Sequence, residues 1–146
     1  MLQNFGSVRG EEIVELIEEI NPHFISDKQS NQHFIFETFP TANCVGIFKK
    51  KIAYKATSGK KATVLEGVKT LMKEMQKHFW FKQQFSIIEK KVNTVLNNQP
   101  SKKELKLLDD QIDALLCAYT AFRYFYEPKQ TRSFGSGRAQ LIIAYA

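Results

Sequence analysis

The segment LLDDQIDALLCAYTAFRYF, residues 107–125, is strongly apolar and yet carries three aspartates close together. Its apolar residues recur three and four positions apart, which predicts an amphipathic helix. Ser101 and Glu104, just upstream, form a capping box, so the helix is expected to begin at Ser101 and to end before Pro128. The predicted apolar stripe consists of Leu105, Leu108, Ile112, Leu115, Tyr119, Phe122 and Tyr126.

The aspartates Asp109, Asp110 and Asp113 need an explanation, because aspartate is a poor helix former. On a helix Asp113 is adjacent to both of the others, and like charges at that spacing repel unless a cation lies between them. Mg²⁺ and Mn²⁺ prefer clusters of oxygen ligands. The alternative is that the acids are solvated near a helix start, but Asp113 lies well past that start, beside the apolar stripe.

Shorter elements are predicted around this helix. Residues 10–20 favour an amphipathic helix, and residues 33–39, HFIFETF, favour a strand that contains Glu37. Pro40 suits the first turn of a short helix through about Phe48. The remaining expected elements are a short strand over 49–55, helices from Ala62 to Phe79 and from Phe81 to Val95, a flexible basic loop over 129–138 and a last strand over 139–146. The prediction is one helix-rich α/β domain over residues 1–146 with short strands.

Composition and charge limit the class of protein. The chain has 146 residues, 43% of them hydrophobic, with a net charge of +6 and a pI of about 9.3, which favours polyanionic partners without requiring them. Cys44 and Cys117 lie far apart and are expected to be buried thiols in a reducing compartment. Neither a bilayer-spanning apolar run nor a secretory signal is present, so a cytoplasmic location is expected by default.

A resemblance joins Glu37 to the aspartates. FIFETFP (34–40), IAYK (52–55) and DDQIDALLCAYTA (109–121) resemble, in that order, the predicted-nuclease family of unknown function in the RNase H-like superfamily, which includes the RuvC-type resolvases. The resemblance implies a partial RNase H-like fold with Glu37, Asp110 and Asp113 as catalytic residues and ligands of Mg²⁺ or Mn²⁺. Such a site hydrolyses phosphodiester bonds of nucleic acid. The resemblance makes Asp109 a neighbour rather than a ligand, although spacing does not exclude it.

The chain departs from the family pattern at its start. The family domain opens with a strand that carries the first catalytic aspartate, and nothing before residue 33 fits that strand. The chain is therefore expected to be the C-terminal half of the domain, either truncated or completed by another chain or a second copy. Weak metal binding and little or no catalysis are expected in consequence.

Basic residues on both sides of the predicted site are candidate nucleic-acid contacts. They are Lys49, Lys50, Lys51, Tyr54, Lys55, Lys60, Lys61, Arg132 and Arg138. The alternative to a metal-dependent nuclease is a non-catalytic basic module that binds nucleic acid or a partner protein through residues 49–61. A third reading is a remnant without a stable fold, which would self-associate through an exposed sheet edge.

Overall fold

The fold is known from a computed structural model that describes residues 15–17, 19–20, 36–135 and 141–145. Residues 15–17 and 19–20 are helical, as predicted, and the rest of the expected 10–20 helix lies outside the described residues. The other elements are α2 (Pro40–Phe48), α3 (Lys61–Lys77), α4 (Phe79–Asn97), α5 (Lys102–Tyr126), the short 3-10 helix η1 (Pro128–Gln130), β1 (Thr131–Phe134) and β2 (Leu141–Ala144). The architecture is helix-rich with a small antiparallel sheet, in agreement with the predicted partial α/β fold.

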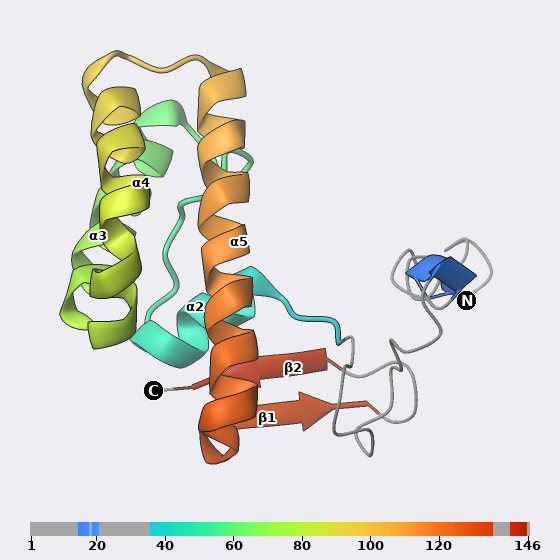
Figure 1. Ribbon diagram of the computed structural model, residues 1–146. Helices are drawn as coiled ribbons and strands as arrows, with labels where there is room; N and C mark the ends of the chain where they lie inside the picture. The colour runs from blue at the N-terminus through green and yellow to red at the C-terminus, as the bar shows by residue number, and fades with distance from the viewer. Residues whose placement is uncertain (1–14, 18, 21–35, 136–140, 146) are drawn as a thin grey trace.

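Helix α5 is the central element. It contacts α2, α4 and both strands, and Figure 1 shows it alongside the α3–α4 pair with the sheet beneath its second half. The capping box is confirmed: Ser101 Oγ accepts the Glu104 N–H, and the Glu104 carboxylate accepts the Ser101 N–H. These bonds satisfy two backbone donors that a helix start otherwise leaves unpaired.

The buried face of α5 differs from the predicted stripe. Leu105, Leu108, Ile112 and Tyr119 are buried as expected, but Leu116 is fully buried while Leu115 is only half-buried and Tyr126 is exposed. The buried positions of α5 are Leu105, Leu108, Asp109, Ile112, Leu116, Tyr119 and Thr120. This face follows the true helical period of 3.6 residues, and it includes Asp109.

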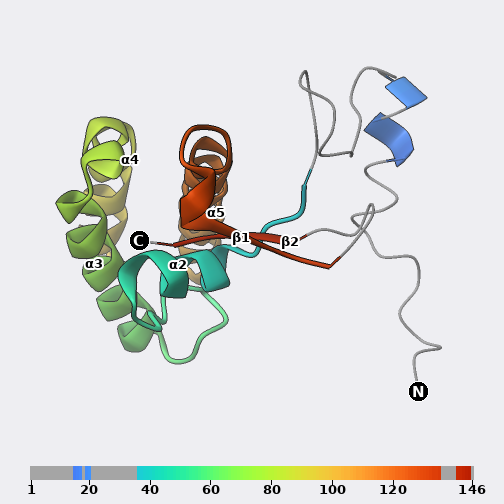
Figure 2. The ribbon, with the colours of Figure 1, turned by 90° about the horizontal axis from the view of Figure 1, so that it is seen from below.

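The sheet lies between two helices. Figure 2 shows the strands edge-on, with α5 on one side and α2 on the other. β1 pairs antiparallel with β2, and Glu37 forms an isolated parallel bridge with Leu141 on the other edge of β2. The expected 33–39 strand is thus reduced, within the described residues, to this single bridge.

Two polar side chains fix that edge. Asn43 is fully buried, accepts the Ala144 N–H at 2.9 Å and donates to Thr38 Oγ1 at 2.7 Å. Thr38 Oγ1 in turn donates to the Ile142 carbonyl. Every hydrogen-bonding atom of the Asn43 side chain therefore has a partner, as a buried amide requires.

Two predictions outside the helices are wrong. Residues 49–55 form no strand among the described residues: Lys49 has a left-handed backbone, and the backbone of Ala53 and Tyr54 lies against Gly67 of α3. Residues 131–134, expected within a flexible loop, form β1. The prediction of a last strand is confirmed by β2.

A candidate carboxylate centre on helix α5

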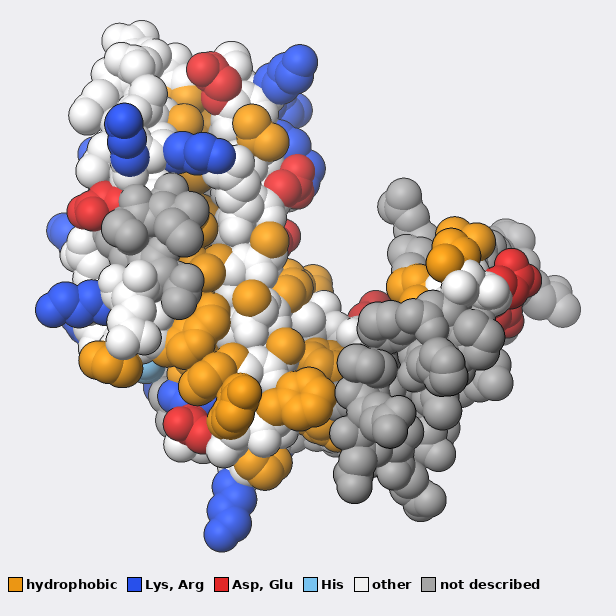
Figure 3. Space-filling view, in the orientation of Figure 1, with side chains coloured by type: hydrophobic (Ala, Val, Ile, Leu, Met, Phe, Trp, Pro, Cys, Tyr) orange, Lys and Arg blue, Asp and Glu red, His pale blue; other side chains and the backbone are white. Residues whose placement is uncertain are grey.

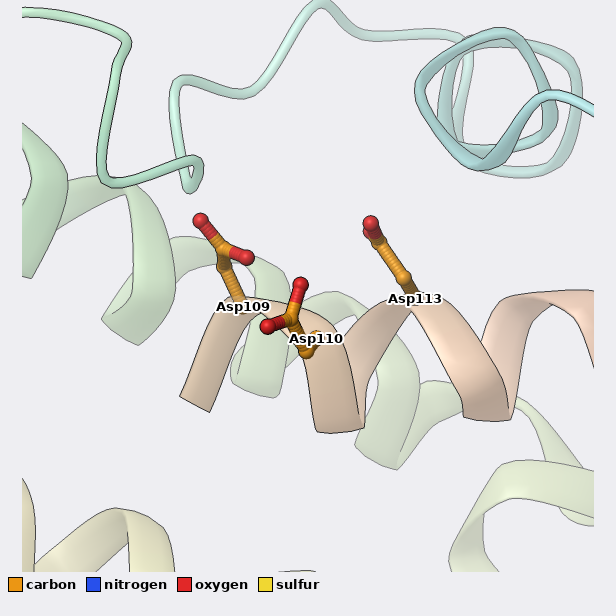
Figure 4. A group of neighbouring side chains, drawn as sticks. All are labelled: Asp109, Asp110 and Asp113. Carbon is orange, nitrogen blue, oxygen red and sulfur yellow. The ribbon is translucent and has the colours of Figure 1, made fainter. Parts of the chain in front are cut away.

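The side chains of Asp109, Asp110 and Asp113 lie together on one side of α5. One carboxylate oxygen from each lies within 4.8 Å of the other two. Figure 4 shows Asp109 and Asp113 pointing toward the segment that joins α2 to α3, with Asp110 between them along the helix. Their exposure is graded: the side chain of Asp109 is 2% exposed, that of Asp113 20% and that of Asp110 55%. The group therefore extends from the protein interior to solvent.

Asp109 is the buried member. One oxygen accepts the backbone N–H of Ala56 at 2.9 Å, and the other accepts Lys106 Nζ at 2.9 Å. Burial of an unpaired carboxylate is costly, and these two contacts provide the compensation. The first contact also ties the α2–α3 connection to α5.

Asp113 is held by two consecutive residues of that same connection. Tyr54 Oη donates to Asp113 Oδ1 at 2.7 Å, and Lys55 Nζ forms an ion pair with Oδ2. Tyr54 is completely buried, and its burial, followed by the adjacent Asp113 charge, raises the pKa of the phenol well above its usual range. Tyr54 is therefore a permanent hydrogen-bond donor to Asp113 at neutral pH.

Asp110 is the solvent-facing member. Its carboxylate forms an ion pair with Lys106, four residues earlier on α5, and this ammonium lowers the pKa of Asp110. Lys106 thus bridges Asp109 and Asp110, and these two partners raise its own pKa. Three carboxylates and two lysines leave this centre with one net negative charge.

The structure brings together two of the three predicted ligands and adds a different third. Asp110 and Asp113 are adjacent, but their companion is Asp109, which had been expected to be only a neighbour. Glu37 is exposed at the edge of the sheet, and it belongs to no group of three metal-ligating side chains among the described residues. Glu37 is therefore not part of this cluster, and its role as a metal ligand stays a prediction.

Tyr54 also needs a correction. It had been expected to contact nucleic acid, but its ring is fully buried and has no exposed face for a base. Its role is to support Asp113 from within the core.

The six lysines among the predicted nucleic-acid contacts divide into two groups. Lys49, Lys50 and Lys55 have internal partners: Lys49 donates to the Gly46 carbonyl, Lys50 pairs with Glu74 at 2.7 Å, and Lys55 pairs with Asp113. Exposed lysines make up the second group, Lys51, Lys60 and Lys61. The Arg132 guanidinium lies 5.2 Å from the centre of the Tyr145 ring, and Arg138 lies outside the described residues.

Sequence reasoning missed Lys106 and the buried role of Asp109. A signal for both was present, because a lysine three and four residues before two aspartates lies on their face of a helix. The position of Asp109 directly after the stripe residue Leu108 also indicated burial once the period was taken as 3.6.

Comparison with known families identifies the family of this chain. Residues 3–136 match the model of the family described as Protein of unknown function (DUF429), so the chain belongs to that family. The match starts at residue 3, well before the first motif of the resemblance at residues 34–40. No curated protein and no solved structure matches the chain.

In the described part of the chain, no helix combines the length and apolarity needed to cross a bilayer. Both cysteines are free thiols, as expected: Cys44 is buried and Cys117 half-buried.

Proposed function

We propose that this chain is a divalent-cation-dependent phosphodiesterase that acts on nucleic acid, with Asp109, Asp110 and Asp113 as the cation ligands. The observation that carries the proposal is the convergence of three carboxylates within 4.8 Å on one helix face. Carboxylate groups are the protein ligands that Mg²⁺ and Mn²⁺ prefer. The family match is compatible with this function but assigns none.

The spacing of the carboxylates fits one cation. Mg²⁺–oxygen bonds are about 2.1 Å long, so two ligands on opposite sides of an ion lie about 4.2 Å apart. Oxygens within 4.8 Å of each other need only a small side-chain adjustment to reach that spacing. Asp109 is fixed by Ala56, whereas Asp110 is more than half exposed and free to adjust.

Each side chain has a distinct task in this proposal. Asp109 provides a buried, fixed oxygen, and Asp113 provides one oriented by Tyr54 and Lys55. Asp110 faces solvent, where an incoming phosphodiester arrives. A bound divalent cation supplies Lewis-acid stabilisation of the negative charge that develops on phosphate during hydrolysis. Lys55 and Lys106 moderate the repulsion among the carboxylates, and also between them and phosphate.

The first test is calorimetric titration of Mn²⁺ into the wild-type chain and an Asp110→Asn variant. Asp110 is the best position to change, because it is exposed and its amide isostere leaves Asp109 and Asp113 in place. Saturable binding that is lost in Asp110→Asn but kept in Glu66→Gln, which removes an exposed acid from α3, supports the site. Absence of binding by a cooperatively folded wild-type chain rejects it.

Activity is tested separately. Labelled DNA and RNA strands are incubated with wild type or Asp110→Asn in Mn²⁺ or in EDTA. Cleavage that requires both Mn²⁺ and Asp110 supports the proposal. Metal binding without cleavage leaves a cation site and rejects hydrolysis by this chain.

A second candidate function is a non-catalytic basic module that binds nucleic acid. The observation that favours it is the pairing of Lys55 and Lys106 with all three carboxylates, which already neutralises most of their charge. Under this alternative the aspartates hold the α2–α3 connection against α5, and nucleic acid binds equally well with and without Mn²⁺.

A further inference from the structure

Two helices begin at the same end of the molecule, and each begins with a pair of lysines. Lys60 is the N-cap residue of α3 and Lys61 its first residue, while Lys102 and Lys103 open α5. All four side chains are exposed. Figure 1 shows both helix starts at the upper end of the molecule, and Figure 3 shows basic side chains around that end, over the start of α5.

The core keeps the elements that carry the two pairs together, so that both helix starts face the same end of the molecule. Ala56 is bonded to Asp109 and Lys55 to Asp113, so the connection that leads into α3 is fixed against α5. Hydrogen bonds with Ser101 and, to a smaller extent, the Lys61 charge lower the pKa of Glu104, which is consistent with a short distance between the starts of α3 and α5. The lysines therefore form one surface, the lysine end: Lys60, Lys61, Lys102 and Lys103.

This placement is unfavourable for the isolated chain. The start of a helix carries the positive end of its dipole, so cations there are destabilising and acids are preferred. Helix α3 has no acid in its first turn and no side-chain cap, and α5 has only Glu104 to offset its two lysines. Like charges from the two pairs also repel each other. A local arrangement that opposes stability is the kind found at functional surfaces.

We propose that the lysine end binds the phosphate backbone of nucleic acid. A chain of phosphates offers repeated negative charges along its length, which suits lysine pairs on two elements better than a single compact anion does. Lys106 is not counted, because Asp109 and Asp110 neutralise it. Among the described residues, Glu104 lies beside Lys90 and Lys91, which line the same groove, so the surface remains net positive. A strand held there passes the exposed side of Asp110, and in this respect the inference rests on the proposed function.

The test measures binding of a short fluorescent DNA duplex by anisotropy, in EDTA and over a series of salt concentrations. The test variant is Lys102→Gln/Lys103→Gln, since glutamine keeps helix propensity while removing charge. The control is Lys69→Gln/Lys73→Gln, which removes two exposed lysines further along α3 beside α4. Both double variants lower the net charge equally, so a difference in their DNA affinity shows that the position of the lysines matters.

We expect the slope of log affinity against log salt to become shallower by about 1.8 in the Lys102/Lys103 variant, about 0.9 for each lost phosphate contact. Affinity at low salt falls by at least about tenfold, and the control changes much less. The thermal midpoint of the Lys102/Lys103 variant does not fall, because repulsion at the start of α5 is relieved. Equal weakening in both doubles, or unchanged binding in the test variant, overturns the proposal.

The outcomes separate this inference from the proposed function. DNA binding that depends on Lys102 and Lys103 in EDTA, in a chain that binds no Mn²⁺, supports the lysine end and rejects the phosphodiesterase. Mn²⁺-dependent cleavage with an unchanged KM in the Lys102/Lys103 variant supports the phosphodiesterase and rejects binding at the lysine end.

Discussion

The backbone of Ala53 passes directly against Gly67 of α3, and a Cβ atom on Gly67 would overlap the carbonyl oxygen of Ala53. The contact explains a glycine in the middle of a helix, where it otherwise weakens helix formation. It also sets the position of the next two residues, Tyr54 and Lys55, which reach Asp113. The geometry of the carboxylate centre on α5 therefore depends in part on the close contact between Ala53 and Gly67 of α3.

Gly67→Ala is therefore expected to destabilise the protein. At an open position in a helix, Gly→Ala raises the free energy of unfolding by about 1 kcal/mol. A decrease in Gly67→Ala would therefore reveal the contact with Ala53. Overlap with backbone requires α3 and the segment around Ala53 to separate, at a cost of about 2 kcal/mol. Thermal unfolding checks the effect, with Thr63→Ala on an exposed face of α3 as control. A raised midpoint in Gly67→Ala would contradict the packing.

Tyr54→Phe is expected to cost about 1 kcal/mol at neutral pH, because Asp113 loses a buried hydrogen-bond donor. The effect also depends on pH. Since the pKa of Tyr54 is raised in the folded state, its contribution is fully present below the ordinary tyrosine pKa of about 10 and is lost as pH rises beyond it.

The measurement is denaturant unfolding of wild type and Tyr54→Phe at neutral and alkaline pH. The stability gap between the two narrows above about pH 10, because only wild type loses the contribution of the phenol. Tyr126→Phe, at an exposed position of the same helix as Asp113, serves as control and shows no gap at either pH. A gap that widens with pH would be inconsistent with a buried, protonated Tyr54.

The helices were predictable because their signals are local. The Ser101 capping box, Pro40 at the start of α2 and the terminating Pro128 each act within one turn, and all three appear where expected. The conformation of residues 49–55 was not predictable from such local signals. Their sequence is compatible with a strand, and only the approach to Gly67, a residue of another element, decides that they pack on a helix instead.

In the candidate site, too, features set by local spacing were predictable and features set by contacts between elements were not. The grouping of Asp110 with Asp113 follows from helical spacing and could be read directly. Glu37 could not be placed in this way, because its distance from α5 depends on how the sheet edge sits under the helix. The burial of Tyr54 depends on a contact between the α2–α3 connection and α5, which no pattern within either segment specifies.

Glu74 leads to an expectation for acid stability. Hydrogen bonds from Lys50 and Lys77 lower the pKa of this carboxylate to about 2. Because the folded-state pKa is below the ordinary glutamate value, the contribution is present above about pH 4.3 and is lost as pH falls toward 2. Thermal midpoints of wild type should therefore fall more steeply over this range than those of Glu74→Gln. Parallel curves for the two proteins would show that the ion pairs add no pH dependence, and Glu66→Gln provides the exposed-acid control.

Lys106 is the residue whose substitution is expected to change the Mn²⁺ affinity of the carboxylate centre. Its ammonium group contacts Asp109 at 2.9 Å and also contacts Asp110, so it occupies oxygens that the proposed divalent cation needs. Removal of the lysine charge in Lys106→Met abolishes this competition while keeping the length and helix propensity of the side chain. The expected result is that the affinity for Mn²⁺ rises a few-fold, because an ion pair of an exposed lysine is weak and only modestly opposes cation binding. Calorimetric titration measures it, beside Lys69→Met, which removes a lysine from α3 outside the centre. Weaker Mn²⁺ binding in Lys106→Met would mean instead that this lysine holds Asp109 and Asp110 in their binding positions, and the competition argument would then be wrong.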